Sequence, residues 1–363
     1  MEFQEIATRS ALELGFTLVG VTVPNPREEL QQRVKNRNEE GGLTPFTPNG
    51  GADLMSVEKQ WPFCRSVLSL GLSYNSTNIP VAGPGEGVVA RIGLGRDYHL
   101  VIQEKIWMLM DELKKMFPDL VYEYQVDNGP LSDRASAWEA GLGFFGKNSF
   151  IIHPDKGSYI NLAQVFTNQP VSAVTKPLES RCGTCTKCMD ACPTHAIGSN
   201  GSLHGDRCIS YLTQKKGVLM QRERTAMGRH LYGCDICQEV CPFNKSASLS
   251  SAAELRWDGN REIFQLDKIL SMTKRVFKDR FGQRAAGWRG KSLLQRNALI
   301  VCGNEQTPGN RDLLLQYLSA PGELLRIHAL YSLEKYGEKE RKWVQKALET
   351  ESESFRNTYE EYR

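Results

Sequence analysis

Hydrophobic and polar positions in the first half of the chain switch repeatedly between helical and strand-like spacing. Apolar residues at helical spacing predict a first helix that ends near Gly15, and the same pattern predicts helices at 98–116 and 131–140. Apolar or alternating runs predict strands at 16–23, 66–74, 120–126, 149–153 and 159–167. Stretches rich in Gly, Pro, Asn and Thr predict loops at 36–52 and 75–87. This mixed order predicts an α/β or α+β domain over residues 1–175.

The last third of the chain has helical patterns and few β-branched runs. Residues 293–299 resemble 324–330 at a spacing near 30, which predicts stacked helix pairs of the HEAT type, with a small helical bundle as the alternative. A cysteine-rich segment at 176–245 separates the two regions. We therefore expect an α+β protein of three domains, at 1–175, 176–245 and 246–363, which suits a length of 363 residues.

Composition narrows the class of protein. Hydrophobic residues make up 40% of the chain and charged residues 24%, as in ordinary globular proteins. No run approaches about 20 apolar residues, so we expect no membrane-spanning helix. The first residues lack the basic and apolar regions of a secretory signal, so we expect a cytoplasmic protein.

Eight of the ten cysteines lie between Cys182 and Cys241. In a reducing compartment they favour a metal or cluster site over disulfides. The first four, Cys182, Cys185, Cys188 and Cys192, have the spacing C-x2-C-x2-C-x3-C-P of bacterial ferredoxins that bind 4Fe–4S clusters. In that arrangement the fourth cysteine ligates the other cluster.

A second run, Cys234, Cys237 and Cys241 followed by Pro242, lacks one thiolate, and Cys208 is the nearby spare. We therefore predict two clusters with crossed ligands. The two ligand sets are Cys182, Cys185, Cys188 and Cys241 for the first cluster, and Cys192, Cys208, Cys234 and Cys237 for the second. Structural zinc is the alternative, but crossed C-x3-C-P runs suit it poorly. Cys64 and Cys302 are expected to be buried and without a chemical role.

The remaining motifs point to no nucleotide cofactor. Gly93 and Gly95 form only a fragment of a dinucleotide motif, and there is no Walker A sequence and no D-x-H-x-x-G. The chain does resemble the epoxyqueuosine reductase family over essentially its whole length. The similarity lies in the cysteine block and in residues 95–99, 133–134, 140–148 and 296–299.

The resemblance implies a cobalamin-dependent iron–sulfur enzyme that reduces epoxyqueuosine to queuosine at the wobble position of tRNA, the last step of queuosine biosynthesis. Residues 1–175 would bind base-off cobalamin, which the two clusters reduce. A carboxylic acid must protonate the departing oxygen, and Asp133 matches the family's acid. Asp133 is otherwise an aspartate at a helix N-terminus. The cofactor-binding candidates are Asp97, Tyr98, Asp133, Lys147, Asn148, His153, Ser158 and Ser210.

Several of these candidates also have structural interpretations. Asp97 can cap the helix that follows it. Tyr98 can be a core aromatic, and Lys147 and Asn148 can belong to an ordinary polar turn. A lone histidine such as His153 is more often hydrogen-bonded than a ligand.

Basic residues cluster in two stretches despite a net charge of only +3. Residues 274–296 hold eight basic residues and one acid, with three aromatic residues among them, a composition that suits phosphate contacts and base stacking. A second stretch lies at 215–229. The predicted RNA-binding residues are Lys215, Lys216, Arg222, Arg224, Arg229, Arg284, Arg289, Lys291 and Arg296. A solvated helix face is the alternative.

Two other functions stay open at this point. A reductive dehalogenase-like enzyme acting on a small molecule has no use for a basic helical domain, and such enzymes commonly carry an export signal. A ferredoxin-like electron carrier would leave residues 1–175 without a purpose. For the RNA-modifying enzyme we expect an external one-electron donor of the flavodoxin or ferredoxin kind, and a monomer.

Overall fold

The computed structural model describes residues 2–24, 32, 44, 46, 57–127, 129, 131–172, 175–199, 201–245, 247 and 249–363. The predicted loop at 36–52 lies outside this part of the chain except for two residues. The chain groups into two compact units. The first comprises 1–77, 96–206 and 235–256, and the second comprises 78–95, 207–234 and 257–363. The cysteine-rich segment is thus shared between the units. The division into three consecutive domains remains a prediction from sequence.

A four-stranded sheet organises the first unit. Its strand order is β1 (Leu18–Thr22), β2 (Ser66–Ser73), β7 (Ile160–Thr167) and β4 (Tyr122–Val126), and every neighbouring pair is antiparallel. The N-terminal region is therefore α+β and not α/β. The predicted strands at these places are confirmed within two residues at either end, since β2 and β7 carry the apolar runs of a sheet that is buried on both faces.

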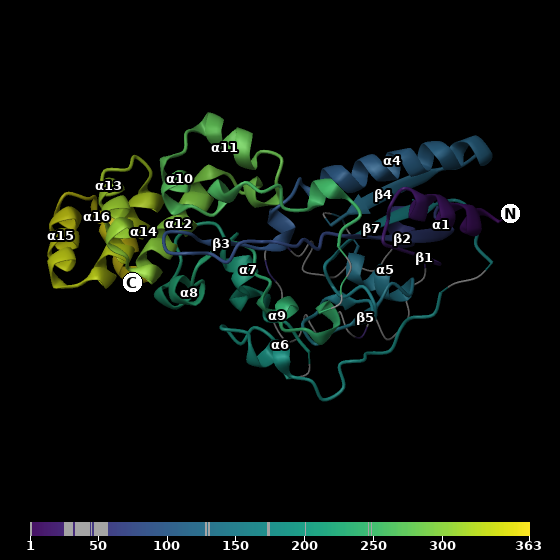
Figure 1. Ribbon diagram of the computed structural model, residues 1–363, viewed down its shortest axis with the longest axis horizontal. Coiled ribbons are helices and arrows are strands. Elements are labelled where there is room, and N and C mark those ends of the chain that lie inside the picture. The colour runs from purple at the N-terminus through teal and green to yellow at the C-terminus, as the bar shows by residue number, and fades with distance from the viewer. Residues whose placement is uncertain are drawn as a thin grey trace. The chain divides into compact units, whose positions relative to one another are not determined.

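Helices cover both faces of this sheet. Figure 1 shows α1 (Phe3–Glu13) and α4 (Tyr98–Met116) on one face and α5 (Asp133–Glu139) on the other. The bounds of α4 match the predicted helix, and Gly15 follows α1 with a φ of +89°, as a C-terminal glycine should. The unit also contains a short hairpin of β5 (Phe144–Phe145) and β6 (Ile151–Ile152) and the short helices α3 (Val57–Gln60), α6 (Lys187–Asp190) and α9 (Ile236–Glu239).

One row of residues crosses all four strands on the α5 side. Gly20, Ser69, Gln164 and Gln125 are register partners from β1 to β4, so their side chains share one face. At Gly20 a Cβ would lie 2.1 Å from the Ala140 carbonyl oxygen, so only glycine lets the end of α5 approach β1 this closely. Ser69, Gln164 and Gln125 are buried. The sheet therefore places a polar strip beneath α5 in an otherwise apolar core.

The second unit is largely helical. The short elements are the parallel pair β3 (Val88–Val89) and β8 (His230–Tyr232), with α7 (Ile209–Leu212) and α8 (Gln221–Ala226). The helices that follow are α10 (Leu266–Ser271), α11 (Lys274–Phe281), α12 (Lys291–Glu305), α13 (Pro308–Gln316), α14 (Glu323–Leu333), α15 (Glu338–Glu349) and α16 (Glu353–Tyr362).

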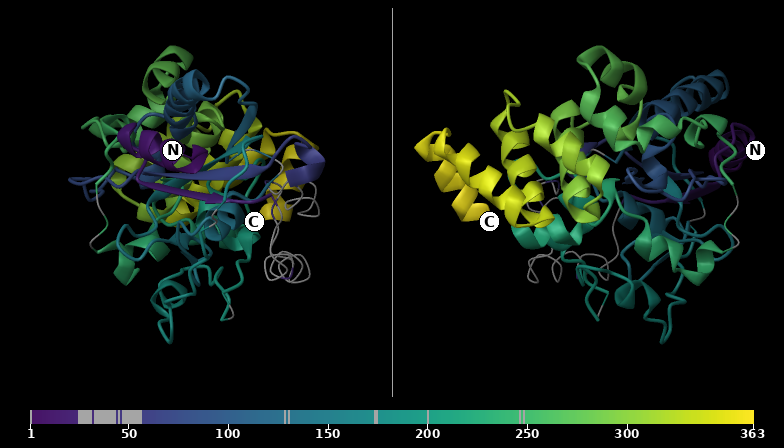
Figure 2. Two further views of the ribbon diagram at one scale, coloured as in Figure 1. Left: turned by 90° about the vertical axis from the view of Figure 1, so that its right-hand side faces the viewer. Right: turned by 60° about the vertical axis from the view of Figure 1, so that its left-hand side comes forward.

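The two similar sequence segments lie in α12 and α14. These helices pack against each other, α13 contacts both, and α15 and α16 contact α14 (Figure 2). Both carry long buried stretches, at 293–303 in α12 and 327–333 in α14. The two segments that resemble each other in sequence are thus two inner helices of one stack.

Candidate functional site

Asp133 is the first residue of α5 and lies over the polar strip of the sheet. Ser132 caps the helix, since its Oγ accepts a hydrogen bond from the Ala135 amide at 3.4 Å. The Asp133 carboxyl is therefore free of the capping role. Its Oδ1 accepts a hydrogen bond from Gln125 Nε2 at 2.6 Å, and its backbone carbonyl accepts one from Gln164 Nε2 at 3.2 Å. The polar strip thus holds both the side chain and the backbone carbonyl group of Asp133.

The environment of Asp133 favours its protonated form. Burial, and then the negative charge of Asp127, raise the pKa of the Asp133 carboxyl well above its usual range, although Gln125 and Arg134 act in the opposite direction. A carboxyl whose pKa is raised in this way holds its proton closer to neutral pH. Asp133 can therefore act as a general acid.

Asp127 links this carboxyl to the start of α4. Its Oδ2 accepts a hydrogen bond of 2.6 Å from the Tyr98 hydroxyl, and His99 Nε2 lies 3.8 Å from the same oxygen. Tyr98 is buried, and its ring stacks on that of His99. Asp97, Tyr98, His99, Asp127 and Asp133 therefore belong to one connected polar group.

Asp97 is the N-cap of α4. Its Oδ1 accepts from the His99 amide at 3.0 Å and pairs with His99 Nδ1 at 2.8 Å. Burial works to raise the pKa of Asp97, but the two hydrogen bonds from His99 outweigh it and the pKa is lowered. Asp97 thus stays ionised and fixes His99, so the capping alternative is confirmed for this residue.

Four cysteines of the first ligand set come together in the first unit. Burial raises the pKa of Cys188, and the nearby thiols of Cys182, Cys241 and Cys185 add to it. Burial likewise raises the pKa of Cys241, with Cys182 and Cys185 again contributing. Cys182 and Cys241 also pack against Phe144 of the β5–β6 hairpin. The four thiols of this set therefore lie near one another, and cysteine thiolates are the donors that a 4Fe–4S cluster takes.

The second ligand set stays a prediction from the sequence, because its members fall in different compact units. Cys192 and Cys237 belong to the first unit, and Cys208 and Cys234 to the second. Cys192 Sγ accepts a hydrogen bond from the Ala196 amide at 3.3 Å. Among the described residues, no three His, Cys, Asp or Glu side chains are arranged to hold a single metal ion.

Gln238 fastens the segment that carries Cys237 and Cys241 to the sheet. Its buried amide donates to the carbonyl oxygen and Oγ of Ser158 at 3.0 and 3.1 Å, and to the Tyr74 hydroxyl at 3.2 Å. Asn244 Nδ2 also donates to Ser158 Oγ at 3.0 Å. Ser158, predicted to contact a cofactor, is instead 1% exposed and occupied by these bonds, because it joins the start of β7 to the cysteine run.

The turn after β5 reaches both cysteine runs. Lys147 Nζ donates to the carbonyl oxygens of Gly183 and Cys185 at 2.8 and 3.0 Å, and Asn148 Nδ2 donates to that of Cys237 at 3.4 Å. Sequence reasoning assigned both residues to the corrin. That assignment stays a prediction; in the structure their polar groups contact the backbone that carries predicted cluster ligands.

Two further cofactor candidates have local partners. His153 Nδ1 accepts hydrogen bonds from the amides of Asp155 and Lys156 at 3.1 and 3.2 Å, so it closes its own turn. Burial, and then the positive charges of Lys156 and Arg181, lower the pKa of His153, although Asp155 acts to raise it. Ser210 Oγ accepts from Gln214 Nε2 at 3.5 Å within the second unit.

Comparison with known proteins assigns the family. Residues 181–244 match the 4Fe-4S double cluster binding domain, and residues 55–128 match the model described as epoxyqueuosine reductase QueG, DUF1730. The chain is 35% identical to the epoxyqueuosine reductase of Bacillus cereus over 346 residues, 94% of this chain and 91% of the relative. It belongs to the epoxyqueuosine reductase family.

Solved structures of epoxyqueuosine reductases have the same fold. One, crystallised with an epoxyqueuosine-modified tRNA-Tyr stem loop, has a TM-score of 0.91 and 34% identity, covering 98% of this chain and 96% of its own. Another, from Bacillus subtilis, has its catalytic aspartate loop swung out of the active site, with a TM-score of 0.90, 34% identity and the same coverage. The α+β fold of the chain is that of the epoxyqueuosine reductases, with a double-cluster domain.

Three of the basic residues predicted to bind RNA have structural roles in this family member. Arg296 is fully buried in α12, where its guanidinium donates to the carbonyl oxygens of Leu212, Lys215 and Gly217. Arg224 is 4% exposed and lies 3.6 Å over the Tyr331 ring. The prediction of a surface role is wrong for both, because a helix pattern in sequence does not reveal which long side chains point inward.

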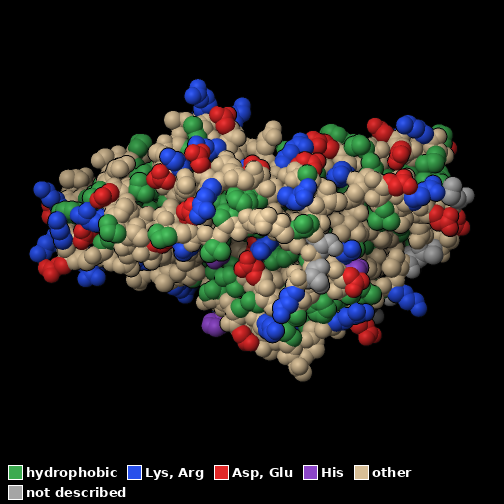
Figure 3. All heavy atoms as spheres, viewed as in Figure 1, with side chains coloured by type: hydrophobic (Ala, Val, Ile, Leu, Met, Phe, Trp, Pro, Cys, Tyr) green, Lys and Arg blue, Asp and Glu red, His purple; other side chains and the backbone are tan. Residues whose placement is uncertain are grey.

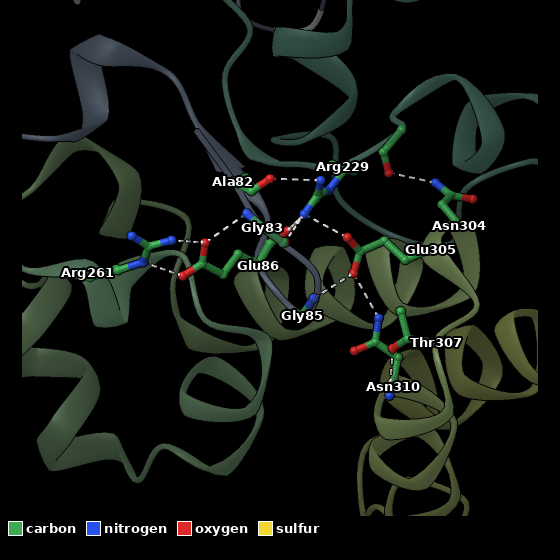
Figure 4. A network of polar contacts seen from close by, with 11 residues as sticks. Ala82, Gly83, Gly85, Glu86, Arg229, Arg261, Asn304, Glu305, Thr307 and Asn310 are labelled. Carbon is green, nitrogen blue, oxygen red and sulfur yellow. Dashed lines mark hydrogen bonds and ion pairs between the residues drawn. The ribbon is translucent and has the colours of Figure 1, made fainter. Parts of the chain in front are cut away.

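Arg229 is the third. Figure 4 shows its guanidinium between the loop at 82–86 and Glu305. It donates to the carbonyl oxygens of Ala82 and Gly83 and pairs with Glu305 at 2.7 Å. On the other side of that loop Glu86 pairs with Arg261 at 2.6 Å. Arg229 therefore ties the loop to α12.

The other basic candidates differ in how far their charge is already paired. Lys215 pairs with Glu223 at 2.7 Å, Arg284 pairs with Asp258, and Lys291 donates to the Met272 carbonyl at 3.3 Å. Lys216 and Arg222 are exposed. Arg289 lies 4.1 Å over the ring of Trp288, which is 52% exposed. Figure 3 shows basic side chains over α11 with acidic ones among them.

Sequence reasoning missed the residues that control the candidate acid. Gln125, Gln164 and Asp127 lie in no motif, and strand β4 and the register of the sheet bring them to Asp133. His99 lies in the 95–99 segment that carries the family resemblance, but the sequence gives it no predicted role. The sequence offers no pattern that singles out the two glutamines, since β4 and β7 carry one glutamine each. Within the described residues, no helix is both long and apolar enough to cross a membrane.

Proposed function

We propose that this chain reduces epoxyqueuosine to queuosine at the wobble position of tRNA. The observation that carries the proposal is identity of 35% across nearly the whole length of a curated epoxyqueuosine reductase. A reductive dehalogenase-like activity on a small molecule is not favoured, since relatives that match over nearly the full length, such as those of Bacillus cereus and Bacillus subtilis, are epoxyqueuosine reductases. Conversion of the epoxide to an alkene consumes two electrons and two protons and releases water.

Asp133 supplies a proton in this scheme. The departing epoxide oxygen would leave as an alkoxide unless a positioned acid protonates it. The raised pKa of Asp133 and its fixed position above Gln125 support this role. The catalytic aspartate loop of the Bacillus subtilis relative supports an aspartate as the residue. Tyr98 and Asp127 orient the neighbouring polar group, and Asp127 helps to keep Asp133 protonated.

Two 4Fe–4S clusters and cobalamin are the proposed cofactors. Cys182, Cys185, Cys188 and Cys241 would hold one cluster, and Cys192, Cys208, Cys234 and Cys237 the other. Cobalamin, when bound, supplies reducing electrons to the epoxide carbon. We propose that cobalamin binds base-off without a histidine ligand, in keeping with the absence of a D-x-H-x-x-G motif from the sequence. Asp97, Tyr98 and Asp133 remain the proposed residues near the corrin.

The proposed tRNA surface lies in the second unit. Its proposed members are Lys215, Lys216, Arg222, Arg289 and Lys291. Arg284 is left out, because its side chain is only 10% exposed and its guanidinium donates to the carbonyl oxygens of Leu94 and Arg280 besides pairing with Asp258. Trp288 offers an exposed ring beside Arg289, and aromatic rings of this kind stack on unpaired bases. We further propose that α12 to α15 form two HEAT-like helix pairs. The protein is proposed to be a cytoplasmic monomer served by a flavodoxin- or ferredoxin-like donor.

One experiment tests the activity. Anaerobically purified protein, loaded with iron, sulfide and cobalamin and reduced chemically, is incubated with an epoxyqueuosine-modified anticodon stem loop. Nucleoside analysis by mass spectrometry is expected to detect queuosine, and omission of cobalamin should abolish it. Turnover of halogenated phenols without turnover of the stem loop would overturn the proposal.

A further inference from the structure

The turn between β5 and β6 touches the cysteine runs through consecutive residues. It is a tight turn in which the Ser149 amide donates to the Gly146 carbonyl at 2.9 Å, and Ser149 has a φ of +64°. The Arg134 guanidinium, one residue after the candidate acid, donates to the Ser149 carbonyl at 2.9 Å. The turn is therefore fixed from behind by α5 while its tip points at the cysteine segments.

Lys147 brings a positive charge to the first cysteine run. Its ammonium donates to the carbonyl oxygens of Gly183 and Cys185, which belong to the stretch that begins at Cys182. Gly183 has a φ of +51°, a backbone conformation that turns this stretch tightly. The side chain is partly buried, so solvent screens its charge less than that of an exposed lysine.

A fixed charge at this place changes the energy of an added electron. A cluster becomes more negative by one charge when it is reduced, and a nearby cation stabilises the reduced form. Net charge, hydrogen bonding and solvent exposure around a cluster set its reduction potential. Lys147 supplies charge directly and limits movement of the loop that holds three of the four predicted ligands.

We propose that Lys147 tunes the cluster held by Cys182, Cys185, Cys188 and Cys241, raising its reduction potential above that of the same site without the lysine. Asn148, which is 4% exposed, contacts the backbone of Cys237 in the other ligand set through an amide and adds no charge. Lys147 thus adds a positive charge beside one cluster site, whereas Asn148 adds only a neutral hydrogen bond beside the other.

This inference rests on the cluster-binding part of the proposed function and not on the substrate. It is tested with K147M, K147R and the matched control K187M. Lys187 is an exposed lysine between Cys185 and Cys188, so its loss changes net charge equally without removing the two carbonyl contacts. Each variant is purified anaerobically with its clusters, and the midpoint potentials are measured by redox titration followed by electron paramagnetic resonance.

We expect K147M to make the midpoint potential of one cluster more negative, by more than K187M does. The midpoint potential of the other cluster should stay nearer to its wild-type value. K147R should stay close to wild type because it keeps the charge. Unchanged potentials in K147M, an equal shift in K187M, or an equal shift in K147R would each overturn the proposal. If K147M does not retain iron, K147Q, which keeps a donor without the charge, is titrated against the same expectations. A failure to reduce epoxyqueuosine would leave these measurements intact.

Discussion

Replacement of Asp133 by asparagine should separate the activity of this protein from its stability. Burial and the charge of Asp127 disfavour the Asp133 carboxylate in the folded state, so its pKa lies well above the ordinary value of 3.8. Asparagine keeps an oxygen that can accept the Gln125 hydrogen bond but has no proton to transfer. Loss of a general acid lowers rates by about 10²–10⁴-fold. We expect a loss of that order in D133N, with clusters and cobalamin retained.

The same substitution should stabilise the fold at neutral pH. The pKa of Asp133 is higher in the folded state than in the unfolded state. Between these two pKa values the folded state binds more protons than the unfolded state, so stability falls as the pH rises through that range. A rise of one in the folded-state pKa of the carboxyl costs about 1.4 kcal/mol of stability once the carboxylate has formed. D133N lacks this cost, so it should melt at a higher temperature than wild type at neutral pH and at the same temperature below pH 3.8.

The assays are single-turnover reduction of the modified stem loop and thermal unfolding of the cluster-loaded protein across pH. D119N, at an exposed aspartate, is the matched control and should change neither result. Wild-type turnover in D133N would refute its role as the acid. A lower melting temperature at neutral pH would refute the argument that the buried carboxylate is destabilising.

Three further results are expected. D127N should move the alkaline limb of the pH–rate profile to lower pH, because the pKa of Asp133 loses the contribution of a neighbouring charge; an unmoved limb would contradict this coupling. R296M should lower the free energy of unfolding by about 3–5 kcal/mol in urea titrations, since it leaves several buried carbonyl oxygens without a donor, whereas an unchanged midpoint would show that the buried guanidinium is dispensable. C182S should lose the iron of one cluster while C64S, at a buried cysteine outside both sets, keeps the full content; equal iron in the two would exclude the ligand assignment.

The sequence alone determined the features that depend on local spacing. The C-x2-C-x2-C run predicts cluster ligands because three thiolates reach one cluster only from a tight loop. The bounds of α4 followed from its apolar period and from Asp97, whose short side chain caps a helix without help from the rest of the chain. These are interactions between residues a few positions apart.

The tertiary structure decided everything that depends on burial and strand register. Arg289 and Arg296 lie seven residues apart in the same basic stretch. Arg296 is fully buried in the helix stack, whereas Arg289 lies against an exposed tryptophan. Asp133 becomes a candidate acid by geometry only because the register of β4 and β7 puts two glutamines beneath it. Burial and register arise from contacts between distant segments, and a single sequence carries no direct signal for them.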